Sequence, residues 1–170
     1  SSVVAKAVFS PVGQIVSYER AEGDIWVSAS YQNGELSTVT SSKAGVPVIR
    51  QEFAADGSVS KETQFDSKGK IAIETTFTSS SKQVTVYVEG TMARLQTRKT
   101  NAPDQEVLVY EETWSGGKRT SQTWNSDSGE LKSSWQLNGD NRFEVTIDKG
   151  IRDERTFVKG VQMLHERLPN

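Results

Sequence analysis

Cysteine is absent from this chain of 170 residues, and histidine occurs once, at His165. The lack of cysteine excludes disulfides, thiol catalysis and zinc–thiolate sites. Hydrophobic residues make up only 34% of the sequence, a thin supply for a compact two-layer core. No apolar run approaches the roughly 18 residues that a transmembrane segment requires. These shortages exclude several classes of enzyme before any pattern is considered.

An excess of charge of one sign is also missing. The 20 Lys and Arg residues are balanced by 22 Asp and Glu residues, which gives a formal net charge of −2 at pH 7. A protein that binds nucleic acid or an anionic membrane normally shows a basic excess. The sequence therefore predicts no nucleic-acid partner, and because no cofactor motif is present it predicts no cofactor either.

The sequence is organised by a repeat of about eleven residues, a length that suits one strand and one tight turn. Each unit runs from an aromatic residue through a short polar stretch to a glycine, one variable residue and an aliphatic residue. Units of this kind are Phe9–Ile15, Tyr31–Leu36, Phe53–Val59, Phe65–Ile71 and Trp124–Leu131. Such a pattern predicts a series of β-hairpins.

The chemistry of the turns supports this prediction. Asp66 suits the first position of a type I turn, and Gly69 can supply the left-handed residue of the bulge that follows. Two different turn lengths then give the same arrangement beside the turn, an aromatic residue opposite an aliphatic one: Phe65 opposite Ile71, and Tyr31 opposite Leu36. Cross-strand pairs of this kind each contribute roughly 0.2–1 kcal/mol and fix the register of the strands.

The strand pattern predicts an all-β fold with a thin core. Several strand middles are polar on both faces, as at Lys61 and Thr63, which a thick sandwich core would not tolerate. We expect one antiparallel meander of about ten to fourteen short strands, in an open or strongly curved sheet that forms a half-barrel or a single layer. A closed barrel is the alternative, because closure removes the edge strands.

The whole chain, residues 1–170, is expected to be a single β-repeat domain. Thr97–Gln105, which contains Pro103, suits one long loop. Val161–Leu168 is predicted as a short C-terminal helix, because Val161, Leu164 and Leu168 would lie on one side of it.

The aromatic–(Asp/Asn)–x–x–Gly–x–aliphatic unit resembles the YD repeats of bacterial Rhs-type proteins and the related MORN-variant repeats of small bacterial surface and antitoxin-like proteins. The resemblance covers residues 9–77 and 110–160, with Phe65-Asp66 and Trp124-Asn125 as examples of its first two positions. It implies an extended antiparallel meander and a bacterial, often exported, protein. It implies no catalytic residue.

The first residues, Ser1-Ser2-Val3, suggest a location. Serines often follow the lipid-bearing cysteine of mature bacterial lipoproteins, so a lipid anchor upstream of Ser1 is one expectation. The expected location is the periplasm, the outer membrane or the cell exterior. An antitoxin-like protein would instead be cytoplasmic.

No set of residues predicts catalysis or metal binding. His165 has no Gly-x-Ser-x-Gly elbow as a partner, and Gly116-Gly117 suits a hairpin turn better than a phosphate loop. The oxygen-rich segment Asn125–Glu130 lacks the further carboxylates of a calcium loop. Glu62 and Glu74 recur at equivalent positions and could line up on adjacent strands, where a solvated charge ladder is the favoured interpretation.

The tryptophans are the candidate binding residues. They are Trp114, Trp124 and Trp135, which share one repeat position, together with Trp26. The first three either pack in a modest core, which we expect for at least two of them, or form an aromatic ladder along one rim that binds sugars or peptide side chains. Trp26 lies opposite the apolar stripe of its strand and is expected to be exposed.

Three functions remain open at this point. The favoured one is a non-enzymatic binding or structural module of a bacterial envelope or surface protein, with a protein or glycan as its partner. The first alternative is an immunity or antitoxin-like protein that neutralises a toxin by docking. The remote alternative is a carboxylate-dependent glycan hydrolase, which needs two acids at a defined separation.

Overall fold

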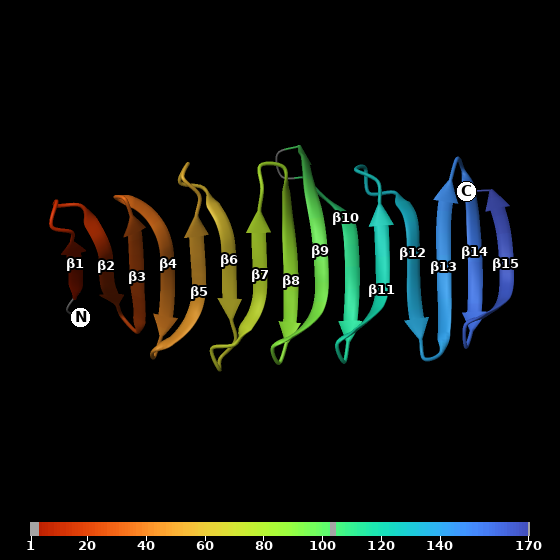
Figure 1. The fold of residues 1–170 in the computed structure, drawn as a ribbon, viewed down its shortest axis with the longest axis horizontal. Coiled ribbons are helices and arrows are strands. Elements are labelled where there is room, and N and C mark those ends of the chain that lie inside the picture. Colours follow the sequence, from red (N-terminus) through yellow and green to blue (C-terminus); the bar gives the residue numbers. More distant parts are fainter. Residues whose placement is uncertain (1–3, 103–104, 170) are drawn as a thin grey trace. The chain divides into compact units, whose positions relative to one another are not determined.

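A computed structural model describes residues 4–102 and 105–169. Within these residues the chain forms fifteen β-strands and no helix, and the strand order follows the chain order (Figure 1). By its internal contacts the chain divides into two compact units, Ser1–Thr78 and Ser79–Asn170. Each unit is an antiparallel meander.

The first unit contains β1 (Ala5–Phe9), β2 (Ile15–Glu22), β3 (Ile25–Gln32), β4 (Glu35–Lys43), β5 (Val46–Phe53), β6 (Val59–Phe65) and β7 (Ile71–Phe77). The second unit contains β8 (Ser81–Val88), β9 (Thr91–Ala102), β10 (Gln105–Ser115), β11 (Lys118–Asn125), β12 (Leu131–Asn138), β13 (Asn141–Asp148), β14 (Ile151–Val158) and β15 (Val161–Pro169). Among the described residues of each unit the first strand does not pair with the last, so neither unit closes into a barrel. The predicted all-β open meander is confirmed, with one strand more than the upper end of the expected range.

The predicted turns are confirmed in detail. At the β6–β7 turn the amide of Gly69 donates to the carbonyl of Asp66 at 3.0 Å, and the amide of Asp66 donates to the carbonyl of Lys70 at 2.8 Å. Gly69 has a φ of 77°, a left-handed conformation that favours glycine. The carboxylate of Asp66 also accepts the amides of Lys68 and Lys70, at 2.8 and 2.9 Å. An aspartate at this position therefore fixes the turn through its side chain as well as its backbone.

The register beside the turns is also as predicted. Phe65 lies opposite Ile71 across β6 and β7, and Tyr31 lies opposite Leu36 across β3 and β4. Gly116-Gly117 forms a two-residue turn, since both glycines have a positive φ and Ser115 pairs directly with Lys118.

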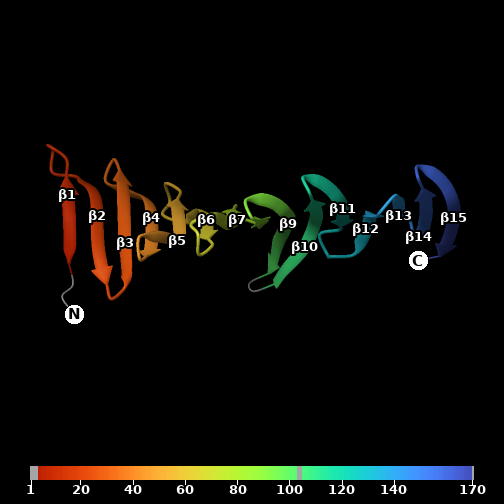
Figure 2. The ribbon, with the colours of Figure 1, turned by 90° about the horizontal axis from the view of Figure 1, so that it is seen from below.

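Each unit is a single layer of strands (Figure 2). Among the described residues no large side chain is fully buried, and Ala29 and Val109 are the buried hydrophobic residues. A single layer has no second sheet or helix to cover its faces. Contacts between neighbouring strands on each face, rather than a central core, must therefore supply most of the side-chain stabilisation.

Two expectations about local structure are wrong. Val161–Leu168 is not a helix, because Lys159 and Gly160 form another tight turn, with φ values of 48° and 81°, and Val161 pairs with Val158 in the hairpin of β14 and β15. The helical spacing of three apolar residues was outweighed by this turn. Most of Thr97–Gln105 belongs to β9 and β10 rather than to a long loop, and Pro103 lies outside the described residues.

Candidate binding site

The sheet register brings several large side chains together on one face of β10, β11 and β12. Trp124 on β11 lies opposite Tyr110 on β10, and Gln122 lies opposite both Glu112 on β10 and Trp135 on β12. Because residues two apart on a strand share a face, these five side chains form one connected group, which we call the aromatic cluster.

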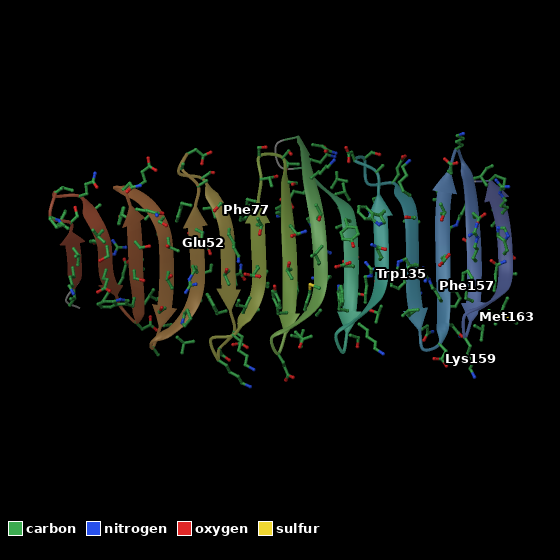
Figure 3. The ribbon with its side chains drawn as sticks, in the orientation of Figure 1. Glu52, Phe77, Trp135, Phe157, Lys159 and Met163 are labelled. Carbon is green, nitrogen blue, oxygen red and sulfur yellow. The ribbon has the colours of Figure 1, made fainter. Side chains whose placement is uncertain are left out.

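A chain of hydrogen bonds links the cluster across three strands. The indole Nε1 of Trp135, which is labelled in Figure 3, donates to Oε1 of Gln122 at 2.9 Å. Nε2 of Gln122 donates to the hydroxyl of Tyr110 at 3.0 Å, and this hydroxyl donates to Oε2 of Glu112 at 2.6 Å. Each donor has an acceptor, so the chain of bonds holds the three strands at a fixed register.

Glu112 is the charged end of this chain and is only 8% exposed. Burial raises the pKa of its carboxyl, but its polar neighbours outweigh burial and hold the pKa below its ordinary value. These neighbours are the hydroxyl of Tyr110, the nearby indole of Trp114 and the guanidinium of Arg119, which lies 3.3 Å away. Burial and the bond to Glu112 raise the pKa of the Tyr110 phenol. Glu112 is therefore an ionised acceptor at neutral pH, held in place by its donors.

Trp135 has a structural environment. The guanidinium groups of Arg119 and Arg142 lie 5.4 and 4.9 Å from its ring centroid, within the range of cation–π contacts. The side chain is half-buried, and its indole nitrogen is already bonded to Gln122. The ring and the indole nitrogen of Trp135 thus both contact other side chains of the protein, which indicates a structural role.

Trp114 is also half-buried, beside the β10–β11 turn. Its Nε1 atom is buried and makes no hydrogen bond of normal geometry, although it lies close enough to Glu112 to lower the pKa of that carboxyl. Trp114 therefore lies beside the buried end of the cluster and is less exposed than Trp124.

Trp124 differs from both, because its side chain is 49% exposed. Its ring meets that of Tyr110 with centroids 4.2 Å apart and planes tilted by 47°. The contact fixes the orientation of Trp124 while leaving much of its surface open to solvent. An oriented, exposed indole is the usual form of an aromatic binding platform.

An open groove of about 530 Å³ lies beside this platform. Its lining is mixed, with two aromatic rings, one aliphatic side chain, three neutral polar side chains and one ion pair. The lining residues are Gln83, Thr97, Lys99, Val109, Tyr110, Trp124, Asn125 and Asp127. The volume falls within the roughly 300–1,000 Å³ that is typical of small-molecule sites. We call this feature the Trp124 groove.

One wall of the Trp124 groove is the turn between β11 and β12. Nζ of Lys99 on β9 lies 2.7 Å from Oδ1 of Asp127 in this turn, and the side-chain amide of Asn101 donates to the carbonyl of Asp127 at 2.5 Å. Gly129 in the same turn approaches Val107 so closely that an added Cβ would lie 3.1 Å from its Cγ1. The contacts of Asp127 reach across β10 to Lys99 and Asn101 on β9, and Gly129 contacts Val107 on β10 itself. Together they hold the wall in place.

The predicted binding residues are therefore only partly assembled. Trp114, Trp124 and Trp135 belong to neighbouring strands but form no single rim, because successive hairpin turns lie at opposite ends of the strands. Trp114 lies next to the β10–β11 turn and Trp124 next to the β11–β12 turn. Trp26 is 39% exposed, as predicted, and lies on β3 in the first unit, whereas the other three tryptophans belong to the second unit.

Sequence reasoning missed the neutral and charged members of the site. Tyr110, Gln122 and Lys99 were not singled out, although one signal was available. In Gln122-Thr123-Trp124 the polar residue stands two positions before the tryptophan, and such spacing on a strand puts both side chains on one face. The role of Lys99 could not be found this way, since it depends on its contact with Asp127 in the β11–β12 turn, which is distant in sequence.

The remaining acidic and histidine candidates lie elsewhere. Glu62 pairs with Thr75 and Glu74 with Thr63, so the two acids project from opposite faces and do not line up. Nζ of Lys61 lies 2.5 Å from Glu74, whereas Glu62 accepts from Gln51 and Gln64.

His165 lies 2.9 Å from Asp153, on the exposed strand β15. Among the described residues no group of three or more His, Cys, Asp or Glu side chains could hold a metal ion, and Asn125–Glu130 forms a turn.

The first unit has a hollow of a different character. It measures about 570 Å³ on one face of β2 to β6 and is lined mainly by serine and threonine hydroxyls, with Glu19, Arg50 and Glu52 among them (Figure 3 labels Glu52). Two of these hydroxyls, on Ser30 and Thr38, already bond to each other at 2.8 Å. The aromatic residue that lines this hollow, Phe53, is half-buried, so the Trp124 groove with its more exposed indole is the better candidate for ligand binding.

The fold and the site define the class of this protein as an all-β protein of repeated hairpins with an aromatic groove on one sheet face. No protein-family model matches the chain, and neither does any curated protein.

Solved structures give distant likenesses. The crystal structure of TarM is 16% identical with a TM-score of 0.39, covering 52% of this chain and 16% of that one. Accessory secretory protein 1, 2 and 3 of Streptococcus pneumoniae gives 14% identity, a TM-score of 0.26 and coverage of 81% and 19%. The crystal structure of TcdB2-TccC3-TEV is 12% identical with a TM-score of 0.25, and the match covers 98% of this chain and 13% of that one. The chain thus spans less than a fifth of each of these chains, and likenesses this distant carry no functional conclusion.

No helix among the described residues is long and apolar enough to cross a membrane.

Proposed function

We propose that this chain is a non-enzymatic binding module of a bacterial envelope or surface protein, which presents its sheet face to a protein or glycan partner. The observation that supports this function most is Trp124. Its ring is oriented by Tyr110, is 49% exposed and borders a groove with polar walls. Tryptophan combines a large apolar ring with a polar N–H group and is enriched at binding interfaces for that reason.

The acidic groups near the groove support a binding rather than a catalytic role. Hydrogen bonds from Tyr110 and Arg119 help to hold the pKa of Glu112 below its ordinary value, which makes it a poor proton donor at neutral pH. Asp127 is ion-paired with Lys99. A glycan hydrolase needs two carboxyls at a defined separation, one of which donates a proton and therefore has a raised pKa, and Glu112 does not fit that proton-donor role.

The bacterial setting rests on the resemblance of the hairpin unit to YD repeats and MORN-variant repeats. The confirmed turn chemistry at Asp66 and Gly69 agrees with that unit. The periplasm, the outer membrane and the cell exterior are the locations that such a module would occupy.

The test is a binding screen with arrays of glycans, peptides and purified bacterial surface proteins, probed with the wild-type chain and with Trp124→Ala. We expect at least one class of probe to bind the wild type and to lose binding in Trp124→Ala. The matched control is Trp26→Ala, which removes an exposed tryptophan outside the groove. If no class of probe binds in a way that depends on Trp124, the proposed function is wrong.

A further inference from the structure

The Trp124 groove carries information about the chemistry of its ligand. From the composition and charge of its lining, we infer that the groove binds a short neutral saccharide. This inference rests on the proposed function and narrows it from a protein or glycan partner to one class of ligand.

The platform suits the apolar face of a sugar ring. A pyranose presents C–H groups on its faces and hydroxyl groups at its edge. The exposed indole of Trp124, fixed in orientation by Tyr110, offers a flat apolar surface for the C–H face. Fixing the ring in advance lowers the entropy that binding has to overcome.

The rim of the groove suits the hydroxyl edge. Gln83 and Asn125 contribute amide groups, and Thr97 contributes a hydroxyl, so the rim can both donate and accept hydrogen bonds. The side-chain amide of Asn125 donates to the carbonyl of Leu108 at 2.9 Å, which orients its oxygen as a remaining acceptor. Groups that both donate and accept match sugar hydroxyls, which do the same.

The charge of the groove excludes strongly charged ligands. Its lining contains one cation and one anion, Lys99 and Asp127, and these two are paired at 2.7 Å. An anionic ligand would have to compete with Asp127 for Lys99, and a cationic ligand would have to compete with Lys99 for Asp127. A ligand without charge leaves the pair intact and can hydrogen-bond to its outer atoms.

The backbone around the groove argues against a peptide or a nucleic-acid strand. A peptide that binds by adding a strand needs a free sheet edge, but β9, β10 and β11 each pair on both sides. Stacking of nucleic-acid bases on an aromatic platform normally requires a basic channel for the phosphates. The groove has no net charge, and the chain as a whole carries −2.

The experiment measures binding of neutral, anionic and amino-bearing oligosaccharides, and of a peptide library, by the full chain. We expect neutral oligosaccharides to bind, at least about tenfold weaker binding by Trp124→Ala, and unchanged binding by Trp26→Ala. Affinity should change by less than about twofold between low and high salt, since no ion pair forms with the ligand. Unchanged melting of Trp124→Ala would show that the loss is local.

The outcomes separate the two proposals. Trp124-dependent binding of peptides or proteins alone would overturn the saccharide inference and leave the proposed function standing. Trp124-dependent binding of anionic or amino-bearing glycans alone, or a steep salt dependence, would do the same. Binding of neutral saccharides that survives Trp124→Ala, with no other probe dependent on Trp124, would overturn both proposals, because the ligand would then occupy another part of the chain. Absence of binding by every probe would also overturn both.

Discussion

The hydroxyl of Tyr110 donates to the carboxylate of Glu112 at 2.6 Å, from a position two residues earlier on the same strand. The contact joins the exposed end of the aromatic cluster, where Tyr110 orients Trp124, to its most buried charge. In a single-layer sheet, which lacks a hydrophobic core, polar contacts of this kind supply part of the stabilisation.

Replacing Glu112 by alanine should therefore destabilise the sheet. The change removes an acceptor shared by Tyr110 and Arg119 and leaves the half-buried Tyr110 hydroxyl without its acceptor. We expect the free energy of unfolding to fall by about 2 kcal/mol, the usual scale for hydrogen bonds to a charged group. Urea unfolding of Glu112→Ala measures this effect, with Glu166→Ala on the exposed strand β15 as the control. Equal midpoints for the two variants would contradict it.

The same carboxyl predicts a dependence of stability on pH. The pKa of Glu112 is lower in the folded chain than its ordinary value of 4.5, so the unfolded state binds the proton more readily. The stabilisation of the folded chain by ionised Glu112 is complete at pH values above 4.5 and is lost as the pH falls through the lower pKa of the folded state. Unfolding midpoints measured from pH 7 down to pH 3 should decline less steeply in Glu112→Gln than in the wild type. Parallel curves would show that Glu112 does not contribute.

The extent of prediction from sequence differed between the backbone and the site. Local turn chemistry was sufficient to predict the hairpin at Asp66 and Gly69 and the pairing of Phe65 with Ile71, because both depend on residues within one repeat. The strand Val161–Pro169 was missed, since a spacing of three apolar residues fits a helix when the turn before it is overlooked. The ion pair of Lys99 with Asp127 could not be predicted, because it joins residues 28 positions apart across an intervening strand.

The tryptophans should separate into structural and binding residues. Trp135→Ala removes a half-buried ring with two cationic neighbours and a hydrogen bond, so we expect a loss of about 2 kcal/mol, less than the 3–5 kcal/mol typical of a fully buried ring. Trp124→Ala, which removes a ring that is 49% exposed, should lower the melting temperature much less. Thermal melts of the two variants decide the matter. The opposite order would assign the structural role to Trp124.

The wall of the Trp124 groove provides a matched pair of glycine substitutions. Gly57 and Gly129 occupy the same position in equivalent turns, with φ values of 81° and 90°, and each donates its amide to a carbonyl three residues earlier at 2.9 Å. An alanine at either position should cost about 1 kcal/mol for its left-handed backbone. At Gly57 the new Cβ would meet open space, whereas at Gly129 it would lie 3.1 Å from Cγ1 of Val107.

Gly129→Ala should therefore destabilise the chain more than Gly57→Ala, by up to about 1 kcal/mol, because the turn or Val107 has to move. Shortening the neighbour in the double variant Gly129→Ala with Val107→Ala should remove this excess, which a double-mutant cycle measures as a coupling between the two sites. Gly57→Ala combined with Val107→Ala should show no coupling. Equal effects of the two single glycine substitutions, or a coupling of zero at Gly129, would mean that the turn does not press against β10 and that the groove wall is held by Lys99 and Asn101 alone.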